Sequence, residues 1–345
     1  MSFTPLSKLG AAAAVLLYAV STTIASGDPI HHRLTVALEP EAGRITVTDR
    51  LSLDDSRGAS PTFQLRAGFE LEAKGATLRR SLFARDGVRS YELHRDPGAT
   101  EVVLRYSGTV AADDAHPEHG MPEAIVSKEG VYLDGASAWY PVFADAMVTF
   151  EMDVKLPPGW QAVSQGKRDV ADGPLRWTER SPQDDIYLVA GPFHRYAAQA
   201  GAVSTEIYLL SPDQALADRY LGALARYLPV YERLVGPYPY AKFAVVENRW
   251  ETGYGMPSFT LLGSRVLRLP FILDSSLPHE LLHNWWGNGV YVDFREGNWS
   301  EGLTAYLSDY LVEEAKERGV QYRRGALQKY DSFAAERRDR SLQLL

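Results

Sequence analysis

The chain has 345 residues, of which 45% are hydrophobic and 23% are charged, and it contains no cysteine. This composition is typical of a globular protein long enough for two domains, and it excludes disulfides, thiolate metal sites and a cysteine nucleophile. The formal net charge of -8 argues against nucleic acid and anionic lipid as partners of the chain as a whole, because an acidic protein offers them no counter-charge.

Residues 1–25 differ from the rest of the chain. They hold one charged residue, Lys8, then an apolar run over residues 9–20, then small residues with Thr23 and Ala25 at the spacing of a cleavage site. This order is typical of a secretory signal peptide, and the run is shorter than the roughly 20 residues of a spanning helix. We therefore predict a cleaved signal peptide and no stable membrane insertion afterwards. Because cleavage removes Lys8, the formal charge changes from -8 to -9. Export of a chain without disulfides favours the bacterial periplasm or the extracellular space.

Residues 28–202 carry the pattern of short strands. Segments such as RLTVALE and EVVLRYSGTV alternate apolar and polar residues, and turn clusters such as DPGAT and LPPGW separate them. Alternation with a period of two, interrupted by turns about every ten residues, indicates an antiparallel sheet domain. We predict an N-terminal all-β domain over this range.

The pattern changes to a helical one near residue 203. Asp213 is a helix-start signal, and apolar residues then recur at steps of three and four up to Gly236. Pro229 predicts a kink or a division in this helix. After it, KFAVVE predicts a strand, and the remainder is mostly helical. We place a second domain over residues 203–345.

Residues 279–288 read HELLHNWWGN, and NWSEGLTAY follows. Histidines four apart on a helix lie one turn above each other, so His279 and His283 can direct their rings at one point. Glu280 can reach a water on a metal held there. Glu301 opens the next apolar-periodic segment and supplies a third ligand, and three protein ligands leave one open position, as in a catalytic zinc site. A chance HExxH on an amphipathic helix is the alternative, and Glu296 is a rival third ligand.

This sequence resembles the M1 family of zinc metallopeptidases, which are gluzincins. The likeness rests on HELLHNWWGN and NWSEGLTAY and extends upstream through LPPGWQAVSQG and GPYPYAKFAVVEN. It implies an α+β multidomain fold in which an N-terminal antiparallel, saddle-like β domain precedes a mostly helical, thermolysin-like catalytic domain. It also implies one zinc ion bound by His279, His283 and Glu301, with Glu280 as the general base.

The chain departs from the family pattern in three places. Seventeen residues separate His283 from Glu301, one fewer than the family spacing. In GYGMPS, which matches the substrate-binding segment of the family through Gly255, Met256 and Pro257, the proline replaces the glutamate that grips the free amine of a peptide. Glu247 and Glu251 are alternative amine anchors, although solvated acids are the simpler interpretation of both.

The third departure concerns the C-terminus. The family continues beyond the length of this chain, so the resemblance predicts an incomplete catalytic domain. Tyr330 lies too early to match the oxyanion-stabilising tyrosine of the family. Elsewhere, His116 and His119 in DDAHPEH form either a polar loop or a second metal site.

These observations together predict an aminopeptidase-like zinc metallopeptidase that acts on peptide substrates and not on nucleic acid. Two alternatives stay open. One is a peptide-binding module that retains the zinc site with little or no activity, and the other is a zinc hydrolase of a non-peptide substrate.

Overall fold

A computed structural model describes residues 28–337, except residues 54–59, 86, 100, 112–123, 145, 170–173, 252, 294 and 296. The predicted signal peptide, Glu296, His116 and His119 therefore lie outside the described residues. No helix in the part of the chain that is described is long and apolar enough to cross a membrane.

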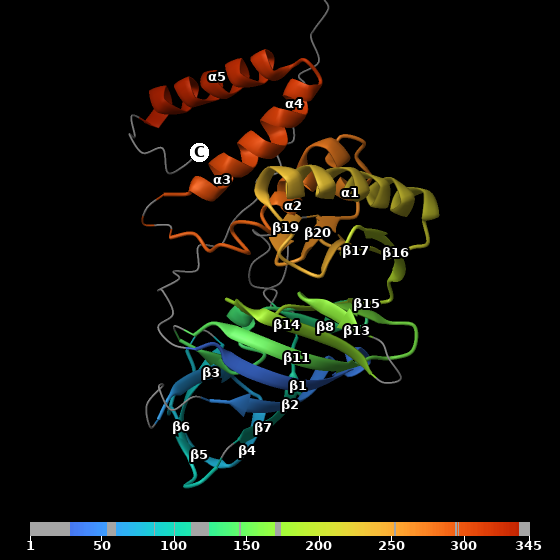
Figure 1. The fold of residues 1–345 in the computed structure, drawn as a ribbon. Helices are drawn as coiled ribbons and strands as arrows, with labels where there is room; N and C mark the ends of the chain where they lie inside the picture. The colour runs from blue at the N-terminus through green and yellow to red at the C-terminus, as the bar shows by residue number, and fades with distance from the viewer. Residues whose placement is uncertain are drawn as a thin grey trace, which may run out of the picture.

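The N-terminal part consists of three sheets (Figure 1). The largest has seven strands in the order β13-β14-β11-β1-β2-β7-β4. Their bounds are β1 (Ile30–Glu39), β2 (Arg44–Ser52), β4 (Glu70–Lys74), β7 (Val102–Thr109), β11 (Val148–Lys155), β13 (Lys167–Asp169) and β14 (Leu175–Gln183).

The two smaller sheets have four strands each, in the orders β10-β3-β6-β5 and β12-β15-β9-β8. The first contains β3 (Thr62–Arg66), β5 (Ala76–Arg80), β6 (Val88–Arg95) and β10 (Val142–Phe143). The second contains β8 (Ile125–Ser127), β9 (Gly130–Leu133), β12 (Gln161–Val163) and β15 (Leu188–Gly191). Short 3-10 turns lie at Pro40–Ala42 and Gly135–Ser137.

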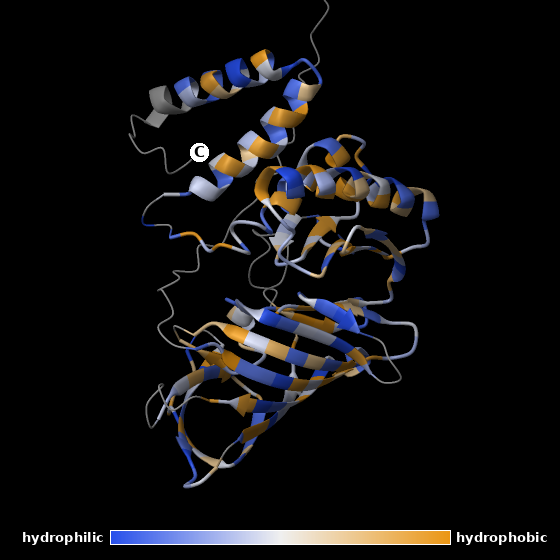
Figure 2. Cartoon of the chain, viewed as in Figure 1, coloured by the Kyte–Doolittle hydropathy of each residue, from blue (hydrophilic) through white to orange (hydrophobic). Residues whose placement is uncertain are grey.

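The predicted alternation is present in these strands. In β1 every second residue is buried, and Figure 2 shows hydrophobic and hydrophilic residues alternating along the strands. The expectation of a wholly antiparallel domain is wrong in one place, because β1 pairs with β11 in parallel. The long stretch of chain between these two strands permits the crossover that a parallel pair requires.

A fourth sheet connects the strands to the helices. Its order is β16-β17-β18-β20-β19, with β16 (His194–Ala200), β17 (Val203–Leu209), β18 (Lys242–Asn248), β19 (Gly253–Met256) and β20 (Phe259–Gly263). Because β16 and β17 form one hairpin, the boundary predicted between residues 202 and 203 divides it. The sheet begins at His194, and its five strands also show that the second part of the chain is less helical than predicted.

The strand predicted at KFAVVE is β18, and all its residues are buried. Ala244 and Val246 pack into the core that the N-terminal strands share. Phe243 and Val245 point to the other face, into a core formed with the helices. A strand covered on both faces has the continuous apolar sequence seen here, so this sheet lies between the β layers and the helices.

Helix α1 (Gln214–Val235) covers the helical face of this sheet (Figure 1). Its predicted start is confirmed, because the side chain of Asp213 accepts a hydrogen bond from the backbone NH of Leu216 at 2.9 Å. Pro229 lies inside the helix and does not divide it. Leu228 and Tyr231 beside the proline are buried, so tertiary packing offsets the one backbone hydrogen bond that proline removes.

The remaining helices follow the sheet. They are α2 (Ser276–Leu282), α3 (Trp299–Ala305), a π-helical turn (Tyr306–Tyr310), α4 (Leu311–Ala315) and α5 (Gly319–Arg337), with short 3-10 turns at Val266–Arg268 and Ile272–Asp274.

Candidate metal centre

Helix α2 presents the first two predicted ligands. Leu277, Leu281 and Leu282 are fully buried in the core, which fixes the orientation of the helix. His279 lies in its last turn, and His283 follows as the C-cap residue with helical backbone angles. The helix begins without a side-chain cap, because the hydroxyl of the N-cap residue Ser275 donates to the carbonyl of Phe271 at 2.8 Å instead.

Helix α3 presents Glu301 in its first turn. A buried hydrogen bond joins this helix to the segment after α2, since the indole NH of Trp286 donates to the hydroxyl of Thr304 at 2.7 Å. The indole is 6% exposed and Thr304 is fully buried. This contact fixes the distance between the two segments that carry the predicted ligands.

The three predicted ligands converge. The Nε2 atoms of His279 and His283 are 3.2 Å apart. Glu301 reaches both rings, with Oε2 at 3.4 Å from His279 Nε2 and Oε1 at 3.2 Å from His283 Nε2. Glu301 Oε1 is buried and makes no hydrogen bond. Buried oxygens need a partner, and these three residues have the arrangement of a group that could hold a metal ion.

Charges around this group shift its pKa values. Burial lowers the pKa of His279, but Asp309 and Glu301 outweigh it and raise that pKa to about 10. Burial raises the pKa of Glu301, but its contacts with His279 and His283 outweigh that effect and hold the pKa well below the usual range. Burial also raises the pKa of Glu280, and the two rings only partly oppose it. Glu280 is 4% exposed.

Strand β19 runs beside Glu280. It forms the edge of the five-stranded sheet and pairs with β20 on one side only. Gly255 lies so close to Glu280 that a Cβ atom there would be 2.3 Å from the carboxylate Oε2. The structure thus brings Gly255, from the predicted substrate segment, against the carboxylate of the predicted base.

Pro257 and Ser258 form the turn between β19 and β20. Ser258 has a positive φ of 66°, and its backbone NH donates to Asn284 Oδ1 at 2.6 Å. The Asn284 amide in turn donates to the carbonyl of Glu280 at 3.0 Å. The turn that contains Pro257 is therefore connected directly to the helix of the predicted metal ligands.

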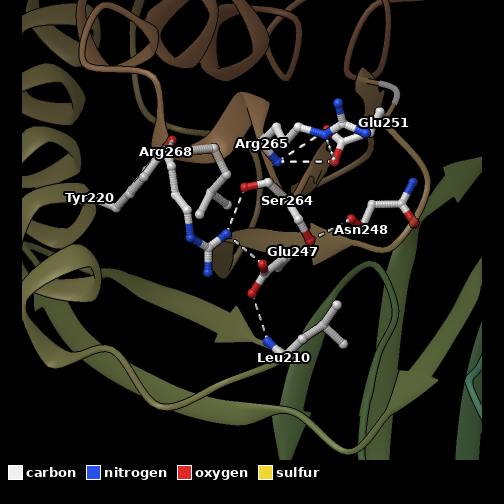
Figure 3. A network of polar contacts seen from close by, with 9 residues as sticks. Leu210, Tyr220, Glu247, Asn248, Glu251, Ser264, Arg265 and Arg268 are labelled. Carbon is white, nitrogen blue, oxygen red and sulfur yellow. Dashed lines mark hydrogen bonds and ion pairs between the residues drawn. The ribbon is translucent and has the colours of Figure 1, made fainter.

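Neither alternative amine anchor is free (Figure 3). Glu247 is 3% exposed and accepts hydrogen bonds from the backbone NH of Leu210 at 2.7 Å and from Arg268 at 2.6 Å. Glu251 accepts from the backbone NH and the guanidinium of Arg265. Both acids therefore serve local structure. The interpretation of both as solvated acids is wrong for Glu247, which is buried in β18, and holds for Glu251, which is exposed.

Sequence reasoning missed Asp309, whose Oδ1 lies 3.6 Å from His279 Nδ1. An acid near a ligand histidine orients its ring. Asp309 follows Glu301 by eight residues, about two helical turns, which places both on one helix face. That spacing was a usable signal. Tyr330, for which the sequence predicts no role, lies on α5 with 42% of its surface exposed.

Sequence comparisons find aminopeptidases. No family model matches the chain. The chain is 27% identical to human aminopeptidase RNPEPL1 over 245 residues, which cover 62% of this chain and 31% of that protein. It is 26% identical to human aminopeptidase B over 218 residues, covering 54% of this chain and 31% of that protein. The match thus spans about a third of the length of these relatives.

Structural comparisons agree on the fold. A variant of the M1 zinc metallopeptidase from Deinococcus radiodurans superposes with a TM-score of 0.64 at 19% identity, covering 92% of this chain and 76% of that one. Native LTA4 hydrolase from yeast superposes with a TM-score of 0.60 at 15% identity, covering 84% and 49%. The chain is thus similar in sequence to aminopeptidases and in fold to M1 zinc metallopeptidases.

Proposed function

We propose that the chain is a zinc-dependent metallopeptidase of aminopeptidase type, with His279, His283 and Glu301 as zinc ligands and Glu280 as the general base. One observation carries this proposal, namely that the Nε2 atoms of His279 and His283 lie 3.2 Å apart and that the two carboxylate oxygens of Glu301 lie 3.4 Å and 3.2 Å from them, respectively. Tetrahedral zinc with ligands at roughly 2.0 to 2.1 Å requires neighbouring ligand atoms about 3.3 Å apart. The donor set of two imidazoles and one carboxylate also suits zinc in a catalytic site.

The roles of the protein groups follow from their positions. Zinc, when bound, acts as a Lewis acid that acidifies a water and polarises a carbonyl. Glu280 accepts the proton of the attacking water and later delivers it to the leaving amine. The burial that raises its pKa favours this exchange, because a general base works best with a pKa near the working pH. Asp309 holds the ring of His279 through Nδ1.

Strand β19 supports a peptide substrate. An edge strand offers backbone NH and C=O groups to an extended peptide, and this edge lies beside Glu280 through Gly255. We therefore assign substrate contacts to Gly255 and Met256. Pro257 offers neither a carboxylate nor a backbone NH, and this favours a second candidate function, a zinc hydrolase that does not require a free substrate amine.

The test is a peptide-library digest with the Glu280→Gln variant as control. We expect zinc content to be unchanged and turnover to fall by about 100-fold or more, since removal of a general base costs roughly 10² to 10⁴. Retained turnover in the variant would refute the role of Glu280. If only peptides with a free amine are cleaved, the result supports the aminopeptidase proposal. If N-acetylated peptides are cleaved as fast as free-amine peptides, the result supports the second candidate.

Two broader proposals accompany this one. We propose a boundary before β16 between an N-terminal β domain and a thermolysin-like catalytic domain, because β16 belongs to the sheet that carries β19. We also propose that residues 1–25 direct export to a periplasm or the extracellular space. N-terminal sequencing of the protein from a periplasmic extract tests the second of these proposals.

A further inference from the structure

The hairpin of β5 and β6 ends in two exposed apolar side chains. Leu82 is 87% exposed and Phe83 is 80% exposed, and Ala84 beside them is also exposed. Adjacent large apolar side chains open to water on a polar surface mark a site of interaction. We call residues 82–84 the apolar tip.

The apolar tip has a defined conformation. The guanidinium of Arg89 donates to the carbonyls of Ser81 at 2.9 Å and Leu82 at 3.4 Å. The hydroxyl of Ser81 donates to the carbonyl of Phe83 at 3.0 Å, and backbone hydrogen bonds join Arg85 to Val88 in both directions. These bonds fix the backbone, so the apolar tip loses little backbone conformational freedom on binding.

Arginines surround the apolar tip. Residues 76–95 contain five arginines against two acids, a local formal charge of +3 in a chain of charge -8. Arg79, Arg80 and Arg85 are exposed, and among the described acids Glu92 pairs with Arg79 at 3.7 Å. Because charges beyond about 8 Å are screened at physiological ionic strength, a surface in contact with the tip encounters this local positive charge. The argument from net charge against anionic lipid therefore does not apply to this hairpin.

We propose that the apolar tip and its arginines form a docking site for an anionic lipid surface. Leu82 and Phe83 insert at the boundary between headgroups and acyl chains, and the arginines contact the lipid phosphates. The β5 and β6 strands lie at the end of the molecule opposite α2 and α3 (Figure 1). A chain docked in this way keeps α2 and α3, which carry the candidate metal ligands, at a distance from the lipid.

The test is sedimentation of the full chain with phosphatidylcholine vesicles, with and without phosphatidylglycerol. We expect binding only to vesicles that contain phosphatidylglycerol, weakening as salt rises. The double variant Leu82→Ser/Phe83→Ser should lose about 100-fold in vesicle affinity, because burial of each large side chain contributes roughly 10-fold. Arg80→Gln/Arg85→Gln should reduce binding and its salt dependence together.

Phe271→Ser is the matched control, because Phe271 is 58% exposed and lies outside the hairpin. It should bind vesicles as the wild type does, and circular dichroism should show that all variants are folded. The proposal would be overturned if the wild-type protein does not bind vesicles that contain phosphatidylglycerol, or if the tip variant Leu82→Ser/Phe83→Ser binds them as tightly as the wild type does. Dimerisation without lipid that the tip variant abolishes would overturn it as well, by assigning the tip to a second copy of the chain.

Discussion

The contact between β19 and the predicted base makes Gly255→Ala the most informative substitution. The new Cβ would lie 2.3 Å from Glu280 Oε2, whereas ordinary contact begins at 3.4 Å, so the carboxylate must move by about 1 Å. The end of a glutamate side chain moves at small cost, and we expect the fold to survive. A displacement of this size costs about 100-fold in rate, or about 2.7 kcal/mol in activation free energy.

The same strand supplies the control. Gly253 lies two residues earlier on β19, and its nearest neighbour for a new Cβ is Leu262 at 3.8 Å, an ordinary contact. We expect Gly253→Ala to keep its turnover number for peptide hydrolysis and Gly255→Ala to lose it, with zinc content and thermal midpoint similar in both. Equal activity in the two variants would refute the reasoning, and so would loss of zinc from Gly255→Ala.

Further predictions concern stability and metal affinity. Burial lowers the pKa of Lys242 to about 7 from its ordinary value of 10.5, so between these two pH values the unfolded chain binds a proton that the folded chain does not. This group alone makes stability rise with pH above 7 by up to about 1.4 kcal/mol per unit, whereas His279, whose pKa is raised to about 10, opposes that rise equally in every variant. The slope of stability against pH from urea titrations should therefore be more positive in the wild type and in the exposed control Lys128→Met than in Lys242→Met, by up to that amount. Thr304→Val leaves the Trp286 indole NH without a partner, so the free energy of unfolding should fall by about 1 to 3 kcal/mol. Zinc affinity, measured by competition with a chelator, should fall as well. Thr304→Ser keeps the hydroxyl and should retain both the stability and the zinc affinity of the wild type.

Much of the candidate site could be predicted from the sequence because its determinants are local. The four-residue step between His279 and His283 and the helix start before Glu301 each depend on a few neighbouring residues. The same is true of the cap at Asp213 and of the strand at KFAVVE. In each case the apolar period and the local signal agree, and tertiary packing then holds the element in place.

The features that were missed depend on approaches between distant segments. No local pattern shows that Gly255 lies against Glu280, because the contact arises where a sheet edge meets a helix. The parallel pairing of β1 with β11 joins strands separated by most of the N-terminal part. The continuity of α1 through Pro229 reflects packing of the buried residues beside it. Asp309 is different, because its eight-residue spacing from Glu301 could have been recognised in the sequence.

The central claim is that two helical segments bring three side chains together around one zinc ion. Its most direct test is the zinc content of the purified chain after dialysis against metal-free buffer, in the wild type and in Glu301→Ala. We expect one zinc ion per wild-type chain and roughly a tenth of that or less in the variant, because a two-histidine site holds zinc weakly. A wild-type chain without zinc, or a variant that retains it fully, would contradict the account.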